Sequence, residues 1–298
     1  MTSETGRIAR AVDNAIRHPR AAYRLLLAVA VGFFLVFAAF PLYWLVVVAV
    51  TPTGVAPGLV PEAVTAANLV GVLVGSSFPR YVFNSIVIAA STTVVVVCVA
   101  SLAGYAFGRL EFRGKRWLLI ATLCVAYFPP VAFVIPLFRL LSGALEVSVF
   151  GVTATSPDLF NTPAGPGIPL SGLTMPLAIF VLTTFFARIP DTLEDAARVE
   201  GTTRLGALVR VIVPLSRPGI ATAAVLTFLQ VYTEFFFSLL MTNGDPQDWA
   251  PIVPVLRGLR VANASFAAAA ALVALVPVVV LLALADDHVV AGLTEGYR

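Results

Sequence analysis

Side chains able to bind or react are sparse in this sequence, and several of them interrupt long apolar runs. Glu234 is the single acidic residue of the run 220–240, and Asn84 with Ser85 opens another run. A polar group inside a bilayer is costly and usually faces a bundle interior or water, where it can contact a hydroxyl-rich solute. Hydrogen bonding between neighbouring helices is the alternative for the same side chains. The candidate substrate-path residues are Asn84, Ser85, Gln230, Tyr232, Thr233 and Glu234.

The densest mixture of charges lies elsewhere, in the stretch 189–201. Asp191 and Glu194 have the spacing of a capping box, and Gly201 is well placed to end a helix. We predict a short helix of about two turns outside the hydrocarbon. Its two consecutive small alanines would let another protein approach the backbone closely. A solvated connector helix is the alternative interpretation of the same residues.

The sequence lacks the residue patterns needed for nucleotide binding, for catalysis and for metal binding. The nearest approach to a phosphate-binding G-x-x-x-x-G-K-[ST] loop, at 108–116, has one residue too many between its glycines and an arginine in place of the magnesium-binding hydroxyl. The apolar runs hold no nucleophile–base pair and no His/Cys/carboxylate cluster. We therefore expect no catalytic residue, no metal site and no cofactor in this chain, and no nucleic-acid partner.

The elements that carry these residues are predicted by composition. Hydrophobic residues make up 59% of the chain and charged ones 12%, whereas a soluble domain has about 45–50% and about 25%. A spanning helix needs roughly 20 apolar residues to cross about 30 Å of hydrocarbon. We therefore predict an all-α integral membrane protein with about six transmembrane helices. The predicted spans are 25–50, 82–107, 117–138, 173–186, 220–240 and 266–284.

The basic residues predict the orientation of these spans. Of the 19 Lys and Arg residues, 15 fall on one side of the six-span arrangement and 4 on the other. Basic residues favour the cytoplasmic side, so both termini and the charged helix between spans four and five are expected in the cytoplasm. The N-terminal tail is either a surface amphipathic helix near 8–16 or a solvated basic tail.

The expected domain organisation follows from the spans. It comprises a cytoplasmic basic tail at 1–24, a first transmembrane helix at 25–50, an extracytoplasmic loop at 51–81, a core of five transmembrane helices at 82–285 and a cytoplasmic tail at 286–298. The outer loop at 140–171 is rich in Pro, Gly, Ser and Thr.

One motif links the charged stretch to a known family. From Asp195 the chain reads D-A-A, three residues, Gly201, nine residues, and V-I-V-P ending at Pro214. This resembles the EAA loop of prokaryotic ABC importer permeases, E-A-A-x3-G-x9-I-x-L-P, with matching spacing and conservative departures. Further matches resemble the maltose-type sugar permease subfamily. They are found at 83–85, 103–115, 127–130, 135–138, 233–235 and 292–296.

The resemblance implies a function and partners. It implies a permease subunit that forms the translocation path for a sugar or related polar solute, in the plasma (inner) membrane of a prokaryote. Its EAA loop, at about 191–214, would couple it to a separate ATPase that holds ATP and Mg²⁺. The partners implied are a second, different permease chain, two ABC ATPase subunits, an extracytoplasmic solute-binding protein and membrane lipid. The implied coupling residues are Glu194, Asp195, Ala196, Ala197, Arg198, Glu200, Gly201 and Pro214.

Three alternatives remain beside this interpretation. The first is an ABC permease for a non-sugar solute. The second is a secondary transporter driven by an ion gradient, which usually carries more intramembrane carboxylates or discontinuous helices than this chain offers. The third is a membrane-embedded enzyme, which the missing nucleophiles and metal ligands disfavour.

Overall fold

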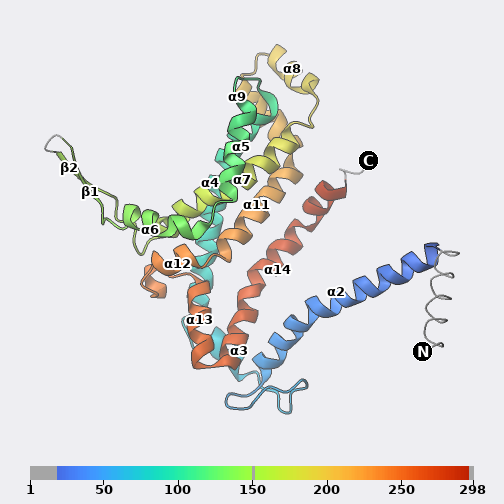
Figure 1. Cartoon of the computed structure of the whole chain (residues 1–298), viewed down its shortest axis with the longest axis vertical. Helices are drawn as coiled ribbons and strands as arrows, with labels where there is room; N and C mark the ends of the chain where they lie inside the picture. Colours follow the sequence, from blue (N-terminus) through green and yellow to red (C-terminus); the bar gives the residue numbers. More distant parts are fainter. Residues whose placement is uncertain (1–18, 150–151, 295–298) are drawn as a thin grey trace, which may run out of the picture.

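The protein is a bundle of tilted helices, seen in a computed structural model that describes residues 19–149 and 152–294 (Figure 1). Within these residues, four helices are long and apolar enough to cross a bilayer: α2 (Pro19–Val50), α4 (Phe78–Arg109), α7 (Ala164–Phe186) and α14 (Ala264–Thr294). Two bent helix pairs raise the number of candidate spans to at most six. The predicted all-α membrane architecture is confirmed.

Two buried apolar clusters hold the bundle together at its opposite ends. One cluster joins α4, α7 and the segment before α11 (Arg217–Tyr232), with Leu182, Phe186 and Ile212 fully buried. The other joins α4, α14, α3 (Ala67–Leu73), α12 (Phe236–Leu240) and α13 (Ile252–Ala262) around Phe237 and Ile252. Because both clusters include α4, this helix connects the two ends of the bundle.

Helix α2 diverges from the other helices and meets them only near its C-terminal end (Figure 1). Val47 and Ala49 are buried there, whereas Phe33 and Phe37 are more than 70% exposed. Its span has a mean hydropathy of 2.7, and the most apolar part of the span has no buried residue in the chain taken alone. Such a surface is stable only in lipid or against another apolar surface.

The third predicted span is sharply bent. Helices α5 (Lys115–Ala126) and α6 (Pro130–Leu141) meet at 89°, so the predicted span over 117–138 is a bent pair of helices rather than one straight helix. Pro129 and Pro130 lie at the bend. Proline lacks the backbone N–H that an uninterrupted helix needs, and it restricts the residue before it to extended conformations.

The fourth and fifth predicted spans also differ from the observed helices. Helix α7 begins at Ala164 rather than Leu173. Pro166 lies in its first turn, where N–H groups have no partner within the helix, and Pro169 and Pro176 lie inside the helix. Helix α11 ends at Tyr232 rather than Leu240, and a break separates it from α12. The bend of 83° in this region lies between the helical segment 204–215 and α11.

The outer loop at 140–171 contains structure that the sequence did not predict. Strands β1 (Glu146–Val149) and β2 (Val152–Thr155) pair antiparallel, with Glu146 opposite Thr155 and Val149 opposite Val152. Figure 1 shows this hairpin extending from α6 away from the bundle. The valines and threonines of this segment are residues that favour strands.

One end of the bundle carries several short elements. These are α8 (Asp191–Val199), α9 (Arg204–Ala207), the π-helical turn η1 (Leu208–Ile212) and α10 (Val213–Leu215). The opposite end carries α3, α13 and the 3₁₀ turn η2 (Pro246–Asp248). The possible surface helix near 8–16 and the end of the 292–296 motif lie outside the described residues.

Candidate functional site

The charged stretch forms the predicted helix. Helix α8 has nine residues, and Gly201 just beyond it has φ +88°, a left-handed conformation that suits glycine at a helix end. The Thr202 hydroxyl donates a hydrogen bond to the Ala197 carbonyl and closes this turn. The capping-box prediction is wrong, because the residue before the helix is Pro190 and its side chain makes no cap.

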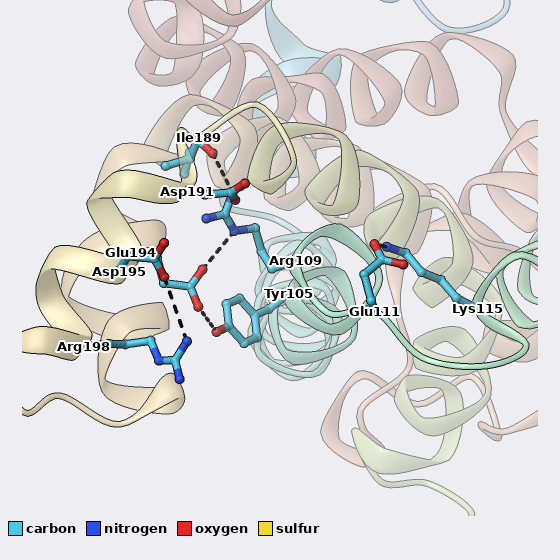
Figure 2. Close-up of polar contacts among 9 residues, drawn as sticks. All are labelled: Tyr105, Arg109, Glu111, Lys115, Ile189, Asp191, Glu194, Asp195 and Arg198. Carbon is cyan, nitrogen blue, oxygen red and sulfur yellow. Dashed lines mark hydrogen bonds and ion pairs between the residues drawn. The ribbon is translucent and has the colours of Figure 1, made fainter.

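The two carboxylates expected to cap α8 point toward the end of α4 instead (Figure 2). Arg109 Nε donates to Glu194 Oε2 at 2.9 Å, and Arg109 Nη1 lies 2.9 Å from Asp191 Oδ1. The same Nη1 donates to the Ile189 carbonyl at 2.6 Å, and the Tyr105 hydroxyl donates to Glu194 Oε1. We call these five residues the Arg109 clamp.

The Arg109 clamp is largely withdrawn from water. The side chain of Arg109 is 4% exposed and that of Glu194 is 10% exposed, whereas Asp191 is 86% exposed. Burial by itself would raise the pKa of the Glu194 carboxyl. The hydrogen bonds from Tyr105 and Arg109, and the positive charges of Arg109 and Arg198, outweigh it, so the pKa lies below its ordinary value. Glu194 is therefore a buried carboxylate held ionised by its partners.

The other face of α8 is exposed. The side chain of Asp195 is 68% exposed and that of Val199 is 88% exposed, while Asp195 and Arg198 approach to 4.0 Å. Ala196 is exposed, and Ala197 is half-buried beneath it. Of the remaining predicted coupling residues, Glu200 and Gly201 are exposed at the end of α8 and Pro214 is exposed on α10. The structure therefore divides the set into one inward residue, Glu194, and an outward surface.

The substrate-path candidates divide into two groups. Gln230, Thr233 and Glu234 line one cavity of about 370 Å³ near the α11–α12 break. Both oxygens of the Glu234 carboxylate accept hydrogen bonds from backbone, from Phe237 N and Ser238 N at 3.0 Å each. These bonds satisfy two N–H groups at the start of α12 that have no partner within the helix. Three aromatic residues absent from the sequence-based set also line the cavity: Phe128, Phe235 and Phe236.

The other candidates lie away from this cavity. Tyr232 is buried and donates from its hydroxyl to the Ala274 carbonyl of α14 at 2.9 Å. Asn84 is fully buried and donates to the carbonyls of Pro246 and Ala250, at 2.8 and 3.0 Å. The Ser85 hydroxyl accepts from Ile252 N at 2.8 Å. In this conformation these three side chains bind protein backbone.

Sequence reasoning did not identify Tyr105 and Arg109 as site residues. Both lie in the segment 103–115, which contributed only to the family resemblance. The available signal was their i, i+4 spacing at the end of an apolar run, which places a hydroxyl and a guanidinium on one helix face.

Together, the apolar bundle and the short charged helix clamped to its end define a class of protein, the polytopic membrane protein. Comparison with known proteins identifies the family. Residues 100–295 match the family described as the binding-protein-dependent transport system inner membrane component, and the chain belongs to it. It is a permease subunit of the ABC importer type, which decides against the ion-gradient and enzyme alternatives.

Individual relatives support this membership. The trehalose transport system permease protein SugB of Mycobacterium tuberculosis is 33% identical over 272 residues, covering 87% of this chain and 92% of SugB. The trehalose/maltose transport system permease protein MalG of Thermococcus litoralis is 31% identical, covering 92% of this chain and 96% of that protein. A chain in the crystal structure of a bacterial ABC transporter that imports alginate has the same fold. Its TM-score is 0.67 at 17% identity, covering 91% of this chain and 97% of that chain.

Proposed function

We propose that this permease carries a sugar or related polar solute across the plasma membrane of a prokaryote, and that α8 couples it to a separate ATPase subunit. The observation that carries the proposal is α8 itself. Its outer face exposes Asp195, Ala196 and Val199, while its inner face is tied to a spanning helix by a buried ion pair. A helix built in this way has a free surface for a partner and a firm attachment to the bundle.

The α8 end of the bundle faces the cytoplasm in this proposal. Basic residues gather at that end, which fits the preference of Lys and Arg for the cytoplasmic side. Helices α8 and α9 and the start of α5 carry Lys115, Arg116, Arg198 and Arg204 there. The ATPase, with its ATP and Mg²⁺, then docks on α8 from the cytoplasm. A second permease chain, a second ATPase and an extracytoplasmic solute-binding protein complete the assembly.

The substrate class is supported by the relatives and by the cavity. The relatives' names include trehalose, maltose and sulfoquinovosyl glycerol transport. In the cavity, Gln230 and Thr233 offer hydrogen-bonding groups beside the rings of Phe128, Phe235 and Phe236. A saccharide presents hydroxyl groups and apolar C–H faces, and this lining suits both. Glu234 acts here through the backbone that it holds, which positions two of the aromatic walls.

The test is a substitution in α8's C-terminal turn. Gly201→Asp places a side chain on a residue with φ +88° and adds a negative charge to the proposed docking surface. Gly114→Asp is the matched control, since Gly114 has φ +86°, nothing within 4 Å of an added Cβ and a position before α5 rather than on α8. We expect Gly201→Asp to abolish ATP-dependent sugar uptake in proteoliposomes and to weaken co-purification with the ATPase, while Gly114→Asp retains both. Full uptake by Gly201→Asp would overturn the proposal.

A further inference from the structure

The last turns of α4 present two different stripes to two different neighbours. Gly104 and Gly108 are four residues apart, as are Tyr105 and Arg109, so each pair lies on one face of the helix. The glycine face meets α7, and the polar face meets α8. The end of α4 is therefore the place where a spanning helix contacts both its neighbour and the coupling helix.

The glycine stripe brings α4 and α7 unusually close. A Cβ atom at Gly104 would lie 3.0 Å from the Leu182 Cβ, and one at Gly108 would lie 3.1 Å from the Thr183 carbonyl oxygen. Glycines spaced in this way let two membrane helices pack backbone to backbone. The fully buried Phe186 of α7 lies beside this contact, in the apolar cluster that joins α4, α7 and the segment before α11. The two helices are thus packed without room for relative sliding at this end.

The polar stripe fixes α8 to the same turns. Among the described residues, both ion pairs between α8 and a spanning helix use Arg109. Arg109 also holds the Ile189 carbonyl, in the turn between α7 and α8. Because the guanidinium is planar and 4% exposed, its three acceptors hold it in one orientation. Tyr105 adds a hydrogen bond to the second Glu194 oxygen.

We infer that Tyr105 and Arg109 are positioning residues that make α8 and the adjoining ends of α4 and α7 one rigid body. A displacement of α8 by the ATPase then moves α4 directly through the buried ion pair, rather than only through the connecting loops. The inference rests on the proposed coupling function of α8, and it adds which spanning helix receives the motion and through which side chains.

The functional test compares the clamp with an exposed ion pair at the same end of the bundle. Figure 2 shows Glu111 paired with Lys115, away from α8, and the Glu111 side chain is 92% exposed. Mutations that modulate coupling between sites typically act by 0.5–2 kcal/mol, so we expect Arg109→Gln to reduce the sugar transported per ATP roughly 2- to 30-fold in assembled complexes. Tyr105→Phe keeps the ring and should cause a smaller reduction. Glu111→Gln should leave the ratio unchanged, and an unchanged ratio in Arg109→Gln complexes that still assemble would overturn the inference.

A distance measurement tests the rigid body directly and does not depend on the variant folding. Spin labels are placed at Glu111 just after α4 and at Leu193, which is 44% exposed on a different face of α8 from Asp195 and Val199. Cys98 and Cys124 are replaced by alanine. In the full complex, pulsed electron paramagnetic resonance should give the same distance between the two labels in the nucleotide-free and ATP-trapped states. A distance that changes while uptake persists would overturn the rigid body and leave the proposed function standing. Failure of the proposed function would show separately, as uptake that survives Gly201→Asp.

Discussion

Replacing Arg109 with methionine would remove one partner of a buried ion pair and leave the other in place. Glu194, whose side chain is 10% exposed, would keep the Tyr105 hydrogen bond and lose the guanidinium. Breaking a buried pair by deleting one partner usually costs 3–5 kcal/mol, because the remaining charge stays buried without compensation. We expect the free energy of unfolding to fall by about 3 kcal/mol or more. The loss should lie toward the lower end of the 3–5 kcal/mol range because Glu194 retains one donor, the Tyr105 hydroxyl.

The assay is thermal unfolding of the detergent-purified complex. A loss of this size should lower the melting temperature by roughly 6 °C or more. Lys115→Met is the control, since it breaks an exposed pair with Glu111, and such pairs contribute about 0–1 kcal/mol. The double variant Arg109→Met/Glu194→Leu removes both charges and should recover much of the loss. If the melting temperature of Arg109→Met falls no further than that of the Lys115→Met control, Glu194 is effectively solvated and its pair with Arg109 is not a buried ion pair.

Three further expectations follow from the same contacts. The pKa of Glu194 is lowered in the folded state, so the ionised carboxylate stabilises the fold fully above the ordinary pKa of 4.5 and loses this effect as pH falls through the folded-state pKa. The difference in melting temperature between the wild type and Glu194→Gln should therefore be constant above about pH 5 and shrink below it. A Cβ at Gly219 would overlap the ring of Phe185, so Gly219→Ala should destabilise the protein by about 1–3 kcal/mol in thermal unfolding, and an unchanged melting temperature would contradict this packing. Glu234→Gln leaves one acceptor oxygen for two backbone N–H groups, so it should reduce sugar uptake while ATPase co-purification persists, and normal uptake would show that the α12 start does not shape the cavity.

The sequence predicted those features that depend on local pattern. The charged stretch 189–201 stands out against apolar surroundings, and the helix predicted from it forms with Gly201 as its stop. Apolar runs likewise predicted the membrane helices, because the length needed to cross a bilayer is a property of consecutive residues. Their ends and bends were less accessible. Pro129 and Pro130 lie within the predicted span 117–138, but residue counting cannot give a bend of 89°.

The missed features depend on contacts between distant residues. Glu194 and Arg109 are 85 residues apart, and only the packing of α4 against α7 brings them together. The capping prediction failed because Pro190 occupies the cap position, and both carboxylates instead bind the guanidinium of Arg109. Glu234 was noticed as an isolated acid, yet its role at the α11–α12 break requires the backbone geometry of that break. Local pattern therefore identified the charged residues, and the fold determines what each one binds.

In the proposed assembly, the exposed face of α8 meets the ATPase in the cytoplasm. Cysteine at Val199, in a background with Cys98 and Cys124 replaced by alanine, provides a probe that is exposed in the chain alone. A membrane-impermeant maleimide should label it in inverted vesicles that lack the ATPase and fail to label it in right-side-out vesicles. Adding the ATPase should protect it. Labelling in right-side-out vesicles, or no protection by an ATPase that supports uptake, would contradict the account.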